Sequence, residues 1–209
     1  MTTNRKLNIT FGLLSVGLLT TLLFKLTTVP GGIILSGFFL GGMIIGGIIL
    51  GCLLVSGILR LIFKKTSFLT IFSITTAISF VAFHYQLYSP TLTIKVPNEY
   101  NGEINLILSN VTDNILTVDS NGIGYLNEWT FKKTYTKPIV EQLDGKNLDK
   151  NLVGFNPSTF WAKGEFTSSE SKMKIQTLSF KINSDDKLGE KRYYSSDLLK
   201  LVDKSKLMK

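Results

Sequence analysis

The sequence predicts two physically different parts: a membrane domain of three transmembrane helices, then an antiparallel β-sandwich-like extracytoplasmic domain with a short C-terminal helix. Residues 1–88 contain no Asp or Glu, whereas residues 89–209 contain all fifteen acidic residues of the chain. Long uncharged runs occupy the first part, and segments in which apolar and polar residues alternate occupy the second. We therefore expect a membrane domain over 1–88 and a β domain over 89–209.

Three apolar runs are each long enough to cross a bilayer. The first covers about 7–24, between Lys6 and Lys25. A cleaved signal peptide is the alternative, but the run is long for one and no small-x-small cleavage site follows it, so we expect a retained helix. The second covers about 33–59 and exceeds one hydrocarbon thickness, which a tilted helix explains. The third covers about 67–88 and ends in the aromatic cluster FHYQLY, typical of a membrane interface.

The positions of the basic residues predict an orientation. Three spans place the amino terminus and the loop with Arg60, Lys64 and Lys65 on one side, together with Arg5 and Lys6. Cytoplasmic loops carry the excess of Lys and Arg, so this side is expected to be cytoplasmic. The chain is then a multi-pass protein of a bacterial inner or plasma membrane, with its C-terminal domain outside the cytoplasm.

The second span is rich in glycine at a spacing that favours helix packing. The six residues concerned are Gly37, Gly41, Gly42, Gly46, Gly47 and Gly51. They form three pairs four residues apart, and such pairs let a second helix approach closely. Packing among the three spans of one subunit is the simpler interpretation. Homo-oligomerisation, or docking to another membrane protein, is the alternative.

Period-two alternation predicts about seven strands in the second part. The segments are TLTIKVP, EINLILS, NILTV, IGYL, EWTFKKTY, TFWAKGEF and KMKIQTLSFKI. The first two flank a turn at 98–102 and predict a hairpin, and the turn spacing as a whole is that of an antiparallel sandwich. Ser195 or Ser196 is expected to cap a terminal helix over about 196–206.

Turn residues in this region carry a family resemblance. In IKVPNEYNGEINLIL and DSNGIGYL the residues concerned are Val96, Pro97, Tyr100, Gly102, Asn121 and Gly122. Over about 91–135 the chain resembles a family of uncharacterised bacterial domains in which a strand ends in Val-Pro and Tyr-x-Gly and Asn-Gly turns follow. The resemblance implies a membrane-associated β module, similar to transthyretin-like domains, and brings no known activity.

The second part lacks the residues of common catalytic mechanisms. It has neither His nor Cys, which excludes Ser-His-Asp and Cys-His catalysis and leaves no ligands for zinc. The single cysteine, Cys52, cannot form a disulfide within the chain. Asp119, Asn121 and Gly124 are spaced like part of a calcium loop, but the bidentate acid is missing, which favours a turn. Asp185 and Asp186 are likewise expected to form a solvated turn and not a metal site. We expect no enzyme activity, catalytic residue, metal or cofactor, although Ser–Lys or paired-carboxylate chemistry stays open.

Aromatic residues give one candidate surface. Trp129 and Phe131 share parity on a predicted strand, which indicates an inward face. Trp161 has the opposite parity to Phe160 and, if exposed, would mark a partner surface or a contact with the membrane.

These observations together predict a membrane-anchored envelope protein whose extracytoplasmic domain binds or scaffolds a partner. The expected partners are the lipid bilayer and, through the second span, a second copy or a membrane protein complex. Nucleic acid is not expected, because the cations of the first part flank its apolar runs. An immunity or inhibitor protein against a toxin, or an accessory subunit of a transport complex, is the alternative; the ligand of the β domain is left unspecified.

Overall fold

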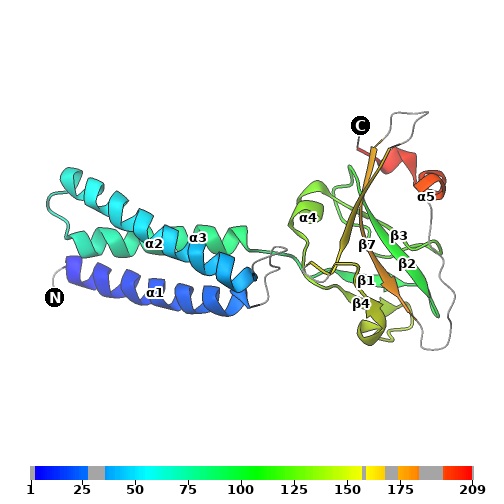
Figure 1. Ribbon diagram of the computed structural model, residues 1–209, viewed down its shortest axis with the longest axis horizontal. Coiled ribbons are helices and arrows are strands. Elements are labelled where there is room, and N and C mark those ends of the chain that lie inside the picture. Colours follow the sequence, from blue (N-terminus) through cyan, green and yellow to red (C-terminus); the bar gives the residue numbers. More distant parts are fainter. Residues whose placement is uncertain (1–2, 28–35, 157–158, 168–173, 184–194, 209) are drawn as a thin grey trace. The chain divides into compact units, whose positions relative to one another are not determined.

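A computed structural model of the chain contains two compact units, residues 1–88 and 89–209, which are described separately (Figure 1). The division falls between Tyr88 and Ser89, where the acid-free part of the sequence ends. The structure describes residues 3–27, 36–156, 159–167, 174–183 and 195–208.

The first unit consists of three helices, α1 (Thr3–Leu26), α2 (Gly37–Ile62) and α3 (Phe68–Gln86). Each is long and apolar enough to cross a membrane. The side chains of Ser36 and Ser67 cap α2 and α3 by accepting hydrogen bonds from backbone N–H groups of the first turn. The three helices therefore correspond to the three apolar runs, and α2 and α3 each begin directly after a capping serine.

Hydrogen bonds between polar side chains join α1 to α3. The Ser15 hydroxyl donates to the backbone oxygen of Ser73 at 3.2 Å, and the Ser73 hydroxyl donates to Asn8 Oδ1 at 3.0 Å. Toward the other end of the pair, Leu22 and Phe80 are buried in one apolar cluster. Polar and apolar contacts thus hold the two helices together along their length.

A second set of hydroxyl contacts joins α2 to α3. Ser56 and Thr75 share a hydrogen bond of 2.9 Å between their hydroxyl oxygens. The Cys52 thiol donates to Ser79 Oγ at 3.3 Å. The helix α3 consequently forms polar contacts with both of its neighbours.

The second unit is built on a mixed five-stranded sheet. Its long strands β2 (Gly102–Leu108) and β7 (Lys174–Ile182) pair antiparallel, with Asn105 opposite Ser179. The strand β3 (Ile123–Leu126) pairs parallel with β2. On the other side of β7 lie two antiparallel strands, β5 (Leu152–Val153) and β6 (Ala162–Thr167).

A separate two-stranded sheet corrects the predicted topology. The strand β1 (Thr93–Val96) pairs parallel with β4 (Ile139–Gln142), a strand that the sequence pattern did not indicate. The predicted hairpin between the first two strands is wrong, because β1 and β2 belong to different sheets. The expectation of a purely antiparallel fold is replaced by a mixed one, since β1–β4 and β2–β3 are parallel.

Two predicted strands are also replaced. The segment EWTFKKTY forms the helix α4 (Glu128–Lys133), which Asn127 caps by accepting from the Thr130 N–H at 2.9 Å. The segment NILTV contributes only isolated bridges to Lys95 and Tyr125. A local cap therefore overrides the strand propensity of the aromatic residues in α4.

Each face of the large sheet has its own apolar core. The core shared with the small sheet contains Leu92, Ile94, Val96, Ile104, Leu106, Val118, Leu126, Phe131, Val140, Leu148, Trp161, Leu178, Phe180 and Ile182. The core of the opposite face contains Ile107, Ile123, Tyr125, Ile175, Leu198, Val202 and Leu207. The large sheet is thus buried on both faces, with C-terminal residues completing the second core.

The C-terminal segment is two short helices, where one helix over 196–206 was predicted. They are α5 (Ser195–Leu201) and the 3₁₀ turn η2 (Lys204–Lys206). Asp203 separates them and caps η2 by accepting from the backbone N–H and hydroxyl of Ser205. These hydrogen bonds hold the pKa of the Asp203 carboxyl below its ordinary value. The predicted caps, Ser195 and Ser196, have side chains outside the described residues.

Among the turn residues that carry the family resemblance, Tyr100 lies in contact with both Gly102 and Gly122. The Tyr100 hydroxyl donates to the Glu103 carbonyl at 2.7 Å, and its ring lies beside Gly102 and Gly122. Gly122 has a φ of +76°, and a Cβ there would overlap both the Tyr100 hydroxyl and the Glu103 carbonyl oxygen. Glycine is required at this position for its backbone conformation and for the close approach of Tyr100.

Replacing Gly122 with Ala is expected to destabilise the second unit by about 2–4 kcal/mol, because strain and overlap add. Gly145→Ala is the matched control: Gly145 has a φ of +90°, but a Cβ there meets nothing within 4 Å. Its cost should be strain alone, about 1 kcal/mol. Chemical denaturation of the full chain in detergent, followed by tryptophan fluorescence, measures both. Equal losses for the two variants would contradict the role of Tyr100.

Candidate docking surface

The six glycines of α2 do not form one stripe, although the spacing suggested it. Successive pairs are offset by five residues, and an α-helix turns by about 100° per residue, so neighbouring pairs point about 140° apart. The structure buries both residues of the first pair, exposes both residues of the second, and leaves the third pair with Gly47 exposed and Gly51 half-buried.

The first pair, Gly37 and Gly41, faces the interior of the first unit. Both residues are buried. A Cβ at Gly41 would overlap the side chain of Leu26, which is itself buried. This pair serves packing inside one chain, which is the simpler of the two interpretations drawn from the sequence.

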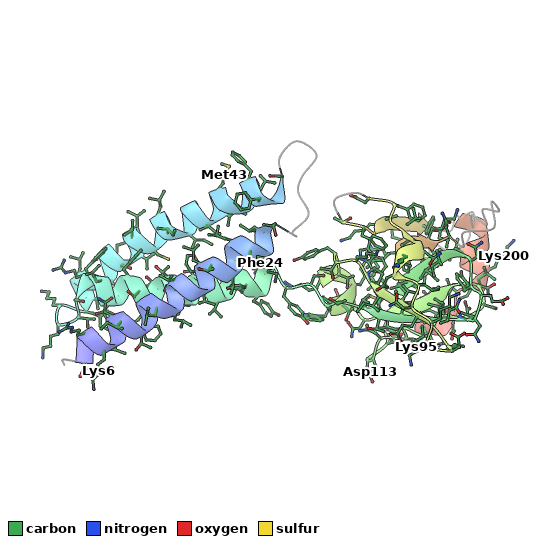
Figure 2. The ribbon with its side chains drawn as sticks, turned by 90° about the horizontal axis from the view of Figure 1, so that it is seen from below. Lys6, Phe24, Met43, Lys95, Asp113 and Lys200 are labelled. Carbon is green, nitrogen blue, oxygen red and sulfur yellow. The ribbon has the colours of Figure 1, made fainter. Side chains whose placement is uncertain are left out.

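The second pair, Gly42 and Gly46, lies outside the buried face of α2. Both are exposed, and a Cβ at either position meets nothing within 4 Å. Figure 2 shows the neighbouring Met43 projecting from the side of α2 opposite to α1 and α3, and its side chain is exposed. We call Gly42 and Gly46 the outer glycine pair. No described part of the chain packs on it.

In the third pair, Gly51 lines a groove between α2 and α3, whereas Gly47 is exposed and does not line it. A Cβ at either position meets nothing within 4 Å. The groove has a volume of about 370 Å³. Its lining residues are Ile48, Gly51, Cys52, Val55, Thr75, Ile78 and Ser79. Because the Cys52 thiol is already bonded to Ser79, the groove offers a mostly apolar surface that fits hydrocarbon.

His84 lies between helices. Its Nε2 is 3.0 Å from Thr21 Oγ1 and 3.2 Å from the backbone oxygen of Leu18, so it links α3 to α1. Since a carbonyl oxygen can only accept, Nε2 carries the hydrogen. This arrangement accounts for the histidine as a structural contact between helices.

Trp161 does not provide the surface that the sequence suggested, because it is only 1% exposed. Its ring packs edge-on against Phe180, with centroids 5.2 Å apart, and its Nε1 donates to the Thr136 carbonyl at 2.8 Å. The parity argument fails because Phe160, with a φ of +64°, interrupts the regular alternation just before β6. The indole is therefore a core group of the second unit.

Trp129 is the exposed tryptophan instead, at 46%. The predicted strand would have turned Trp129 and Phe131 to the same side. On the helix α4, residues two apart point about 160° apart, and Phe131 is buried while Trp129 is not. The sequence signal for this helix is Asn127, a favoured N-cap residue directly before Glu128, which the strand interpretation did not use.

The acidic residues considered for metal binding have other roles or lie outside the described residues. Asp119 Oδ1 accepts from the N–H groups of Asn121 and Ile123, each at 2.9 Å, and so stabilises a turn. Asp185 and Asp186 lie outside the described residues. Within the described ranges, no group of three His, Cys, Asp or Glu residues is placed to hold a metal ion.

Comparisons with known proteins add little. No family model and no curated protein sequence matches the chain. A crystal structure of a presumed lipoprotein from Bacillus anthracis aligns over 53% of this chain and 89% of its own, with 12% identity and a TM-score of 0.29. A score of that size does not establish a shared fold, and the family resemblance drawn from the turn residues stays a prediction.

The buried Gly41 and the exposed Gly46 predict different effects of alanine on the stability of the helical unit. Gly41→Ala should destabilise the helical unit by about 1–3 kcal/mol, because Leu26 must shift within a packed cluster. Gly46→Ala should change stability by less than about 1 kcal/mol, because its Cβ enters open space. Thermal loss of the helical circular dichroism signal in detergent measures both variants. A larger loss for Gly46→Ala would contradict the assignment of the two faces.

Proposed function

We propose that the protein is a membrane-anchored cell-envelope protein, in which the first unit spans the bilayer and docks to a second membrane helix. Its second unit is the part that binds or scaffolds a partner outside the cytoplasm. The observation that carries the docking proposal is the outer glycine pair: Gly42 and Gly46 are one turn apart, exposed and uncovered by the described chain.

Glycine at this spacing matters because of what drives helix association in lipid. Lipid tails are as apolar as leucine, so two helices associate through close packing and not through the hydrophobic effect. Two glycines one turn apart let the partner backbone approach closely. Either a second copy of α2 or a helix of another membrane protein satisfies this requirement.

Intramolecular packing explains Gly37 and Gly41 and leaves Gly42 and Gly46 without a role. The third pair is also open at both Cβ positions, but its Gly51 lines the groove between α2 and α3. In an isolated anchor, a larger residue at either outer position would fit, because a Cβ there meets nothing within 4 Å. Leucine also has a better helix propensity than glycine. Two glycines one turn apart at an exposed face are therefore better explained by an intermolecular contact.

The second unit supports a recognition role by its surface. Apart from Trp129, its exposed large apolar residues are Ile139, Leu143, Val153, Phe155, Leu201 and Met208. Among them, Val153 belongs to β5, at the edge of the large sheet, and Phe155 lies two residues further along the chain. Exposed apolar residues at a sheet edge provide both side-chain contacts and backbone groups for a partner chain.

Replacing both Gly42 and Gly46 with Leu is expected to abolish a crosslinked complex in membranes, because the leucine side chains hold the partner helix away. Gly17→Leu on α1 is the matched control, since a Cβ at Gly17 also meets nothing within 4 Å. The crosslinked species are resolved by gel electrophoresis and identified by mass spectrometry. A second copy of the chain as the partner indicates a homo-oligomer, a transporter indicates an accessory subunit, and a toxin indicates an immunity protein. An unchanged complex in the double variant would contradict docking through this pair.

The proposed orientation predicts opposite labelling of two engineered cysteines in a Cys52→Ser background. Cysteine at Ser120, which is exposed in the second unit, should react with an impermeant maleimide added outside intact cells. Cysteine at Thr66, beside Lys64 and Lys65 in the loop after α2, should react only after lysis. The reverse pattern would show that the second unit is cytoplasmic.

A further inference from the structure

The short helix α4 exposes a combination of side chains suited to a membrane surface. Trp129 is 46% exposed, and Lys132 follows one turn later with a side chain that is 68% exposed. Glu128 forms an ion pair with Lys132, and Lys133 completes the helix. The helix therefore has one acid against two lysines beside an exposed indole.

Hydrogen bonds fasten the carboxyl end of this helix to the residue where the chain enters the second unit. Ser89 Oγ accepts from the backbone N–H groups of Tyr135 and Thr136, at 3.0 and 3.2 Å. The Thr136 hydroxyl also donates to the Pro90 carbonyl at 3.2 Å. Within the second unit, α4 and the chain entry at Ser89 consequently lie at the same end.

The length of the connecting chain determines which end of the second unit is held at a membrane. Only Leu87 and Tyr88 lie between Gln86, where α3 ends, and Ser89. Three residue steps of extended chain reach no more than about 11 Å. If α3 spans the bilayer, the Ser89 end stays within this reach of the end of the span, whatever angle the two units adopt.

We propose that α4 is an interfacial anchor, in which the Trp129 indole enters the headgroup layer of the bilayer while Lys132 and Lys133 contact anionic lipid headgroups. This inference rests on the membrane location proposed above. Tryptophan favours the membrane–water boundary because it has an apolar ring and one polar N–H. Lysine keeps its ammonium at the headgroups while its stem lies along apolar surface.

The anchor would restrict the second unit as well as bind it. A single connection of two residues leaves a domain free to pivot about it. A second contact through α4 presents the opposite end of the mixed sheet to a partner. The surface around Trp129 is accordingly assigned to lipid and not to a protein partner.

The experiment measures quenching of tryptophan fluorescence in the full chain reconstituted into phosphatidylcholine nanodiscs that contain lipids with a headgroup nitroxide. In Trp161→Phe, Trp129 is the remaining tryptophan, and most of its emission should be lost. In Trp129→Phe, the buried Trp161 should keep its emission. Quenching of Trp129 no greater than that of Trp161 would overturn the proposal.

Trp161 is a core residue, so a second comparison avoids replacing it. Wild-type protein should lose a fraction of its emission that Trp129→Phe does not lose, and equal fractional quenching of the two would overturn the proposal. With phosphatidylglycerol added to the discs, Lys132→Gln with Lys133→Gln should reduce the quenching of Trp129. Unchanged quenching would overturn the headgroup contact of the lysines.

Recovery of the chain with the nanodiscs on size-exclusion chromatography separates the two levels of the proposal. A chain that does not enter the discs refutes the membrane location and with it the anchor. A chain that enters the discs while Trp129 remains unquenched refutes only the anchor.

Discussion

The first unit depends on one constraint: in an apolar surrounding, each polar group needs a partner inside the protein. Several serine and threonine hydroxyls, the Cys52 thiol and His84 meet this requirement through contacts on α3, which bonds to Asn8 and Ser15 on one side and to Ser56 on the other. Thr76 on the same helix is an exception, because its hydroxyl is buried and has no hydrogen-bond partner among the described residues. These contacts determine which face of each neighbouring helix turns inward. With the inner face of α2 determined, Gly37 and Gly41 are used inside the chain, and Gly42 and Gly46 must point outward. The proposed docking surface is thus a consequence of where the polar groups of α2 and α3 pair.

The second unit depends in the same way on the pairing of β2 with β7. Asn105 and Ser179 lie opposite each other in this pair and share a hydrogen bond of 2.6 Å in a buried position. The pair has an apolar core on each face, and its neighbours β3, β5 and β6 add to its two sides. Strands that are distant in the sequence must therefore meet before either core can close. Trp161 packs against Phe180 of β7 and belongs to the core that this sheet shares with the small sheet, whereas Trp129 lies on the short helix α4 and is exposed.

Much of the fold could be predicted from local pattern, and the errors have physical causes. Five of the predicted strand segments overlap the strands β1, β2, β3, β6 and β7, and β2 and β6 each extend one residue beyond their segment. The segment EWTFKKTY was misassigned because aromatic residues raise strand propensity, whereas the Asn127 cap and the Glu128–Lys132 pair favour a helix. The strands β4 and β5 were missed because short strands with partly exposed faces carry little alternation. The three directions of the glycine pairs followed from their five-residue offset alone, so that part of the candidate site could have been found without the structure.

By itself, the sequence determined the division of the chain at residue 88 and three helices of membrane-spanning length, because charge and hydropathy are local properties that do not depend on neighbours. It also determined where glycine recurs. The tertiary structure decided which glycines are covered, which tryptophan is exposed, and that β1 and β2 lie in different sheets. These outcomes depend on contacts between residues far apart in the chain, such as Leu26 against Gly41, Tyr100 against Gly122 and Trp161 against Thr136. A sequence pattern predicts which environments suit a side chain, but contacts with distant residues determine which of these environments it occupies.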